Sequence, residues 1–193
     1  YYDKKQQNYG FLYPEITGYS ASTLSFLYEI SPNSKLDELA KANTTWLIKI
    51  FQKFGSIVQG ISPDKKRQKF AYTFDAAICA KGLLDYYKIN NSSELLDTAK
   101  SLLTWIVPAI NNNGTVLPYK NLESNNFEED SDVWYRKKGN LHIKISIPFV
   151  QMYELTRDVS FLNIAKKLCD TYPKYVQKNG SLSMHENTDE INL

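Results

Sequence analysis

The sequence predicts an all-α fold built from three consecutive α-hairpins in a single domain that spans residues 1–193. Three observations predict it: an internal repeat, two helix-like segments in every repeat, and a difference in polarity between those two segments. A chain of 193 residues, 42% of them hydrophobic, can bury one substantial core, which fits one domain. The hairpins are expected at about residues 18–55, 75–114 and 141–180.

The repeat runs through three units. Tyr28 recurs 59 residues later as Tyr87, which recurs 66 residues later as Tyr153. The glycines that end the units keep this register, and they are Gly55, Gly114 and Gly180. The longer second spacing is accommodated by residues 111–139, a polar stretch with Gly, Pro and an acidic run that indicates a long loop between units. We call this segment the excursion.

Each unit contains two helix-like segments that are separated by a turn. In the first unit, apolar residues at helical spacing predict a helix over 20–30 and another from about Ser34 to Gly55, divided by Pro32 and its polar neighbours. The equivalent helices are expected over 76–89 and, after a serine N-cap, over about 95–106 in the second unit, and over 147–157 and 161–176 in the third.

The two helices of a unit differ in polarity. The first helices of the second and third units are apolar on nearly every side, whereas the second helices have an apolar stripe and a polar face. A helix that is covered on all sides must be apolar on all sides, so we expect the first helices to form an inner layer and the second helices an outer one. Residues 141–146 alternate like a strand, and Pro148 disfavours a helix interior, but the repeat favours a helix there.

Composition limits the class of partner. Lys+Arg 23 against Asp+Glu 21 leaves a net charge of +2. The basic run Lys65, Lys66, Arg67 and Lys69 is more typical of a solvated loop than of a phosphate-binding patch, so no nucleic-acid partner is predicted. No segment reaches the roughly 20 apolar residues that a membrane-spanning helix needs, so no membrane span is predicted.

Short motifs stand at the expected starts of the inner helices. They are Tyr13-Pro14-Glu15-Ile16-Thr17-Gly18-Tyr19 for the first, Phe74-Asp75 for the second and His142 for the third. With the repeat over about residues 9–182, they resemble the α/α toroid proteins of the six-hairpin group, which includes N-acylglucosamine 2-epimerases, uronic-acid epimerases and six-hairpin glycosidases. The resemblance implies that inner helices surround a funnel, and that residues at their starts line a sugar site.

The chain departs from that group in its number of hairpins. A closed ring of this kind takes six, and this sequence contains three, which corresponds to a half-toroid. The remaining half is absent from this sequence, or a second copy supplies it, or the protein is an open arc. The ends of an open arc expose apolar faces, which favours self-association.

Three residues are candidates for acid/base chemistry. Carboxylates serve as acid, base or nucleophile in sugar chemistry, which points to Glu15 and Asp75. His142 falls at the repeat position of Thr17, and a histidine ordinarily titrates near neutrality. The structural alternatives are that Glu15 and Asp75 are first-turn carboxylates that interact favourably with the helix dipole, and that His142 only forms a hydrogen bond with the backbone. The residues expected to bind the sugar or shape its cleft are Tyr13, Tyr19, Tyr72 and Lys144, of which Lys144 could bind a carboxylate but is more typical of a surface lysine.

The excursion and the cysteines give weaker signals. The acidic residues of the excursion precede Trp134 and fit a lid, a cation site or a solvated loop, of which the solvated loop is favoured because no calcium-loop spacing is present. Cys79 and Cys169 lie in apolar helical patterns and indicate buried thiols rather than a disulfide. Without zinc-ligand spacing or a Gly-rich phosphate loop, no metal and no cofactor is predicted.

Taken together, these features predict a carbohydrate-active toroid protein that acts on a sugar or a uronic-acid-containing glycan. Proton abstraction, as in an epimerase, and glycoside cleavage by a hydrolase or lyase both remain open. The alternative from another class is a non-catalytic α/α repeat that binds glycan or protein on its concave face.

Overall fold

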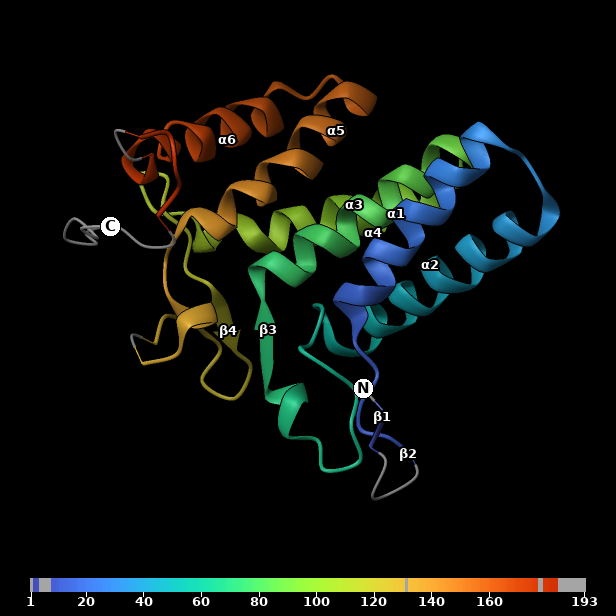
Figure 1. Cartoon of the computed structure of the whole chain (residues 1–193), viewed down its shortest axis with the longest axis horizontal. Coiled ribbons are helices and arrows are strands. Elements are labelled where there is room, and N and C mark those ends of the chain that lie inside the picture. The colour runs from blue at the N-terminus through green and yellow to red at the C-terminus, as the bar shows by residue number, and fades with distance from the viewer. Residues whose placement is uncertain (1, 4–7, 131, 177–178, 184–193) are drawn as a thin grey trace.

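The computed structural model describes residues 2–3, 8–130, 132–176 and 179–183 of the chain. Within them lie six α-helices in three consecutive antiparallel pairs (Figure 1). The helices are α1 (Pro14–Ile30), α2 (Ser34–Phe54), α3 (Thr73–Asn90), α4 (Ser93–Ile106), α5 (Ser146–Thr156) and α6 (Val159–Cys169). This arrangement confirms the predicted all-α fold of three hairpins.

The helices form two layers. Helices α1, α3 and α5 lie in one layer with α3 in the middle, and α2, α4 and α6 each pack on the helix that precedes them. The five consecutive residues Ala76–Ala80 of α3 are all buried, so this helix is covered on every side, as its continuous apolar sequence predicted. The core therefore lies around α3, between the two layers.

Several helix ends follow local sequence rules. The Asn33 side chain caps α2 by accepting a hydrogen bond from the Leu36 amide at 3.0 Å, and Gly55 ends that helix in the left-handed conformation with φ 66°. The Asp158 carboxylate caps α6 in the same way through the Ser160 amide at 3.0 Å. These residues are the turn signals that divide the hairpins in the sequence.

Other boundaries differ from the prediction. Helix α1 begins at Pro14, six residues before position 20, because a proline is well suited to the first helical turn, where its missing N–H has no partner to lose. Helix α6 ends at Cys169 instead of 176, since Pro173 follows in a separate 3₁₀ turn, Tyr172–Tyr175. Cys169 is consequently exposed, and the expectation that it is buried was wrong, whereas Cys79 is buried.

The segment before α5 is helical, as the repeat predicted. Residues Asn140–Ile145 form a 3₁₀ helix that runs directly into α5 at Ser146. Pro148 then falls in the first turn of α5, where no intrahelical hydrogen bond is lost. The alternation of polarity at 141–146 therefore does not reflect a strand.

A small antiparallel sheet attaches the excursion to the start of α3. Its strands are β3 (Phe70–Tyr72), β4 (Tyr119–Asn121) and β5 (Asn126–Glu128), with Tyr72 opposite Tyr119 and Tyr119 opposite Glu128. Figure 1 shows β3 leading directly into α3, with β4 beside it. A separate two-stranded pair, β1 (Tyr2–Asp3) and β2 (Asn8–Tyr9), precedes α1. None of these short strands was predicted.

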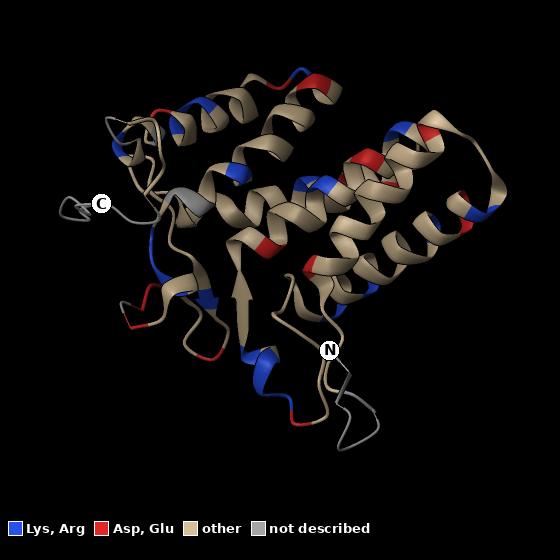
Figure 2. Ribbon diagram, in the orientation of Figure 1, with Lys and Arg blue, Asp and Glu red and all other residues tan. Residues whose placement is uncertain are grey.

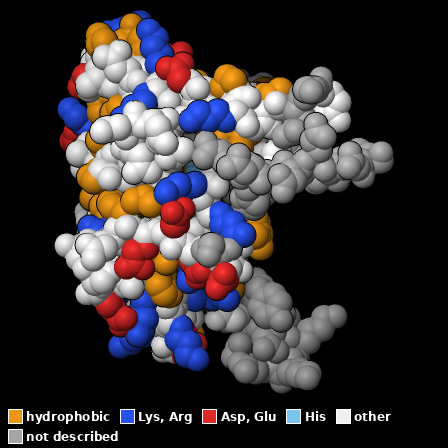
Figure 3. Space-filling model, turned by 90° about the vertical axis from the view of Figure 1, so that its left-hand side faces the viewer, with side chains coloured by type: hydrophobic (Ala, Val, Ile, Leu, Met, Phe, Trp, Pro, Cys, Tyr) orange, Lys and Arg blue, Asp and Glu red, His pale blue; other side chains and the backbone are white. Residues whose placement is uncertain are grey.

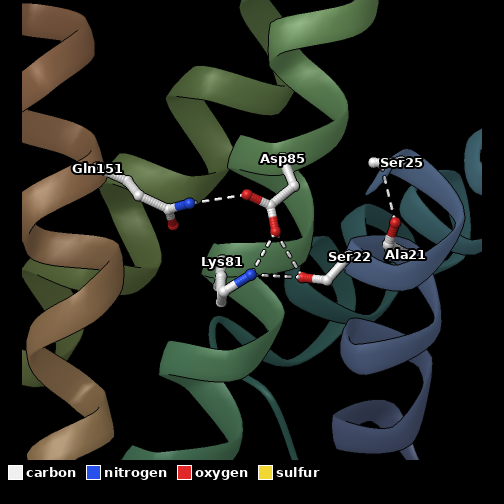
Figure 4. Close-up of polar contacts among 6 residues, drawn as sticks. All are labelled: Ala21, Ser22, Ser25, Lys81, Asp85 and Gln151. Carbon is white, nitrogen blue, oxygen red and sulfur yellow. Dashed lines mark hydrogen bonds and ion pairs between the residues drawn. The ribbon is translucent and has the colours of Figure 1, made fainter. Parts of the chain in front are cut away.

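A polar cluster joins the three helices of the inner layer (Figure 4). The Asp85 carboxylate of α3 accepts hydrogen bonds from the Ser22 hydroxyl of α1 at 2.6 Å and from the Gln151 amide of α5 at 2.7 Å. Lys81, one turn earlier on α3, forms an ion pair with Asp85 and donates to Ser22 at 3.1 Å. Asp85 therefore sets the mutual register of α1, α3 and α5.

The surface is mixed in charge, but α1 exposes apolar residues. On the face shown in Figure 3, basic and acidic side chains are interspersed. On α1, the exposed fractions are 56% for Ile16, 60% for Phe26 and 65% for Ile30, as expected for the end of an open arc. Self-association through such a face stays a prediction. No helix in the described part of the chain combines the length and apolar character needed to cross a bilayer.

Candidate functional site

One pocket of about 470 Å³ brings together the side chains at the starts of the inner helices. All seven residues singled out from the sequence line it, namely Glu15, Asp75, His142, Tyr13, Tyr19, Tyr72 and Lys144. The pocket is completed by five residues that were not among them, namely Gln59, Arg67, Phe74, Trp134 and Tyr135. We call this cavity the acid-pair pocket.

Two glycines let the starts of α1 and α3 approach each other. A Cβ on Gly18 would lie 2.9 Å from the Cys79 Cα, and one on Gly82 would lie 2.5 Å from the Gly18 carbonyl oxygen. No larger residue fits at either position without moving a helix. Figure 2 shows the acidic first turns of α1 and α3 facing each other as a result. Glu15 and Asp75 thus share one rim.

Asp75 is a buried carboxyl group with an unpaired oxygen. Its exposed fraction is 5%, and its Oδ2 atom has no hydrogen-bond partner among the described residues. Burial, followed by the negative charge of Glu15, raises the pKa of Asp75 well above the ordinary value of an aspartate. Burial of this carboxyl group thus opposes the ionised form that a helix dipole would stabilise.

Glu15 occupies a more open environment on the same rim. Its side chain is half-buried and lies close to the Tyr13 side chain. Burial, the Asp75 carboxyl group and the Glu15 carboxyl group together raise the pKa of Tyr13, so the phenol keeps its proton. Burial, with Glu15 and Asp75, also raises the pKa of Tyr19. Two carboxyl groups in unlike surroundings are therefore flanked by protonated tyrosines.

His142 reaches the pocket from the 3₁₀ helix before α5, and it is neutral. Its Nε2 atom lies 3.2 Å from the Lys137 carbonyl oxygen, so Nε2 carries the proton, and its buried Nδ1 atom has no partner among the described residues. Burial lowers the pKa of His142 to about 4. The reason given from the sequence, a pKa near neutrality, was therefore wrong, although the residue lies where the repeat placed it.

The excursion forms one wall of the pocket through its aromatic end. Trp134 and Tyr135 lie in a 3₁₀ helix, Trp134–Arg136, and the Tyr135 ring is 5.9 Å from that of Tyr72. Arg136 donates from Nε to the Tyr72 hydroxyl at 2.8 Å, and its guanidinium stacks over the Phe70 ring at 4.4 Å. Burial raises the pKa of Tyr72 to about 12, although the bond from Arg136 opposes this. Arg136 thereby ties the excursion to β3.

Three acidic residues near the end of the excursion contact side chains within it, whereas Glu123 pairs with Lys69 outside it at 2.7 Å. Glu129 pairs with Lys138 at 2.8 Å, Asp130 lies 3.6 Å from Arg136, and Glu128 accepts a bond from Ser124 at 2.8 Å. No group of three His, Cys, Asp or Glu side chains suited to a metal ion occurs among the described residues. The sequence favoured a solvated loop for these carboxylates, and the aromatic wall that follows them was not among the residues singled out for the site.

Arg67 is the main site residue that the sequence analysis missed. It belongs to the basic run that was interpreted as a solvated loop, and its neighbours Lys65, Lys66 and Lys69 are indeed exposed. Its own guanidinium instead stacks over the Phe11 ring, with 4.0 Å to the ring centroid, at the edge of the pocket. Nothing in the local sequence distinguishes it from the lysines beside it.

The fold of the chain is similar to that of known proteins, although its sequence is not. No family model matches the sequence, and no curated protein is detectably similar to it. Among solved structures, the GH76 alpha-mannanase of Bacteroides thetaiotaomicron matches with a TM-score of 0.73 and 17% identity, over 89% of this chain and 47% of that one. The chain has the fold of half an α/α toroid.

Two further structures match the half-toroid equally well. The cellobiose 2-epimerase of Bacillus thermoamylovorans has a TM-score of 0.72 at 15% identity, over 91% of this chain and 48% of that chain. An inactive variant of a GH76 alpha-1,6-mannanase of Salegentibacter sp., in complex with alpha-1,6-mannotriose, has a TM-score of 0.71 at 14% identity, over 89% and 50%. The half-toroid thus spans about half the length of the structures it matches, and the likeness is one of fold.

Proposed function

We propose that the acid-pair pocket is an acid/base site for a sugar or a uronic-acid-containing glycan, in which Asp75 donates a proton and Glu15 acts as base or nucleophile. The observation that carries the proposal is the buried, unpaired Asp75 carboxyl group beside Glu15. A buried carboxyl group whose pKa is raised, next to a second and more open carboxyl group, is a pairing that suits glycosidic chemistry. The half-toroid fold, which it shares with mannanases and sugar epimerases, supports a carbohydrate as the substrate.

Glycoside cleavage fits the residues better than proton abstraction by histidine. A histidine with a pKa of about 4 is a weak base, so His142 is suited to hydrogen bonding with a sugar hydroxyl through Nδ1. The protonated Asp75 is suited to donate to a leaving-group oxygen. The tyrosines and Trp134 offer ring faces on which a sugar can stack, and each has a polar edge for its hydroxyl groups.

The chemistry need not copy that of the mannanases. The Salegentibacter mannanase was made inactive by substituting two consecutive aspartates, and this sequence contains no two consecutive aspartates. In the half-toroid, the proposed pair comes from two different helices, α1 and α3. We also propose that residues 1–193 are one hairpin domain of a larger toroid, whose other half would close the ring on the far side of the pocket.

Turnover and binding of two glycans test this function. The whole chain is incubated with alpha-1,6-mannotriose and with cellobiose; reducing ends are followed by chromatography and epimerised products by NMR, and binding is titrated in parallel. Asp75→Asn and Glu15→Gln are each expected to lower turnover by at least about 100-fold while binding is kept. Matched controls are Asp97→Asn and Glu38→Gln, which change exposed carboxylates on α4 and α2.

The outcomes separate the competing functions. Epimerised product without cleavage would show that the reaction is epimerisation and not glycoside cleavage. Binding that depends on Glu15 or Asp75, with no turnover in the parent protein, would favour the non-catalytic glycan-binding repeat. Variants of both residues that behave like their controls in turnover and in binding would exclude the acid-pair pocket as the site.

A further inference from the structure

Two cationic side chains of the acid-pair pocket form no ion pair with another described residue. These are Arg67 and Lys144, both of which line the pocket. By contrast, Arg136, which lies next to the pocket but does not line it, is held by Asp130 and Tyr72. The positive charges of Arg67 and Lys144 are therefore available to a ligand.

Arg67 is also held in place before any ligand arrives. Its guanidinium lies over the Phe11 ring at 4.0 Å, and that ring in turn packs against Tyr13 with 5.5 Å between centroids. Stacking of this kind fixes the plane of the guanidinium while leaving its N–H donors at the edges free. A planar fork of donors matches a carboxylate, a sulfate or a phosphate group.

The acidic residues of the pocket do not cancel these charges. Asp75 is driven toward its neutral form by burial and by Glu15, and the buried His142 is neutral as well. Glu15 is then the one carboxylate set against Arg67 and Lys144 among the described lining residues. Asp64, an exposed residue outside the lining, partly offsets the charge of Arg67. The remaining positive charge beside Asp75 favours a ligand that is itself negatively charged.

We infer that the sugar bound in the acid-pair pocket carries an anionic group, which the Arg67 guanidinium binds with two N–H donors while Lys144 adds a second positive charge. The inference rests on the proposed function, since it names the class of sugar that the same pocket takes. It also assigns Arg67 as the residue that distinguishes a charged sugar from a neutral one of the same shape.

Matched sugars test the inference directly. The whole chain is titrated by NMR with D-glucuronate, D-glucose and D-glucose 6-sulfate, and dissociation constants are compared between wild type, Arg67→Ala, Arg67→Lys and Lys144→Ala. Wild type is expected to bind glucuronate at least about tenfold more tightly than glucose, a preference that falls when salt is raised. Arg67→Ala should remove this preference with little change for glucose, and Arg67→Lys should restore part of it.

The control is Lys66→Ala, which removes one positive charge from the same loop without touching the pocket. Its dissociation constants should stay within about twofold of wild type, because exposed charges are largely screened by salt. A stronger response to D-glucose 6-sulfate than to glucuronate would still support an anionic sugar and would assign the group as a sulfate.

Two results would overturn the inference, and they can be told apart. Equal binding of glucuronate and glucose by wild type, or equal losses for both sugars in Arg67→Ala, would refute the anionic sugar and leave the acid/base site intact. Wild-type protein that binds none of the three sugars would refute the proposed function together with it. Arg67→Lys keeps the test valid if Arg67→Ala fails to fold.

Discussion

Asp75 and Asp85 are two aspartates of the same helix, α3, and they are treated in opposite ways. Asp85 accepts hydrogen bonds from Ser22 and Gln151 and pairs with Lys81. Asp75 is buried at the start of the helix, and its Oδ2 atom has no partner among the described residues. The difference separates a carboxylate that holds the fold together from one that costs stability and is available for chemistry.

The largest expected effect tests Asp75. Asp75→Asn keeps the size of the side chain but removes the transferable proton, so turnover of a responsive glycan should fall by at least about 100-fold. The free energy of unfolding, measured in urea by circular dichroism, should not fall, because no hydrogen bond of Oδ2 is lost, and above the ordinary aspartate range it should rise, since the cost of ionising a buried carboxyl group is removed. A large loss of stability with unchanged turnover would show that Asp75, like Asp85, serves to hold the fold together.

The complementary substitution tests Asp85. Asp85→Ala leaves the groups of Ser22, Lys81 and Gln151 without their shared acceptor, so the free energy of unfolding should fall by about 2–4 kcal/mol. Urea unfolding measures it, and Asp97→Ala on the exposed face of α4 is the control, expected within about 0.5 kcal/mol of wild type. If both variants lose the same amount, the polar cluster does not set the register of the inner helices.

The close approach of α1 and α3 can be altered next. Gly18→Ala places a Cβ 2.9 Å from the Cys79 Cα, which should cost about 1–3 kcal/mol of stability as the helices move apart. Turnover should fall as well, because Glu15 and Asp75 are then separated. Thr23→Ala, at an exposed position of the same helix, should leave both unchanged. An unaffected stability in Gly18→Ala would show that the helix crossing is looser than described.

The smallest expected effect is on the pH dependence of stability, to which the buried groups Asp75 and His142 should contribute in opposite directions. The folded-state pKa of Asp75 is raised, so its favourable contribution is present at low pH and is lost as pH rises above the ordinary aspartate range. The pKa of His142 is lowered to about 4, so its contribution is present above about 6.5 and is lost as pH falls toward 4.

Urea unfolding of wild type, Asp75→Asn and His142→Asn between pH 4 and 8 measures both contributions. Each group changes the slope by at most about 1.4 kcal/mol per pH unit within its window. Asp75→Asn should make stability fall less as pH rises, and His142→Asn should make it fall less as pH drops. Changes of the same sign in both variants would contradict the buried, neutral state of one of them.

The repeat predicts far more of this molecule than local pattern alone. It located three hairpins, settled the ambiguous segment before α5 in favour of a helix, and placed Glu15, Asp75 and His142 at equivalent ends of successive units. These successes share a cause. Helical periodicity and repeat register are both visible in the order of residues along the chain, without knowledge of contacts between distant segments.

What escaped the sequence depends on contacts between distant segments. The three-residue strands β3, β4 and β5 are too short to show alternation, and the pairing of β3 with β4 joins residues about 50 apart. Arg67 is distinguished from Lys66 only by the Phe11 ring above it. The shift in the pKa of His142 arises from burial, and the requirement for glycine at position 18 arises from Cys79 on another helix.

The hydrogen bond between Arg136 and Tyr72 attaches the aromatic wall to the segment that leads into α3. Tyr72 is the last residue of β3 and immediately precedes α3, so the aromatic wall and Asp75 are attached to the same short segment. The turn at 122–125, between β4 and β5, lies outside that segment. Insertions in this turn would change the surroundings of the aromatic wall while Asp75 keeps its position, so related chains can differ in the ligand that the pocket accommodates.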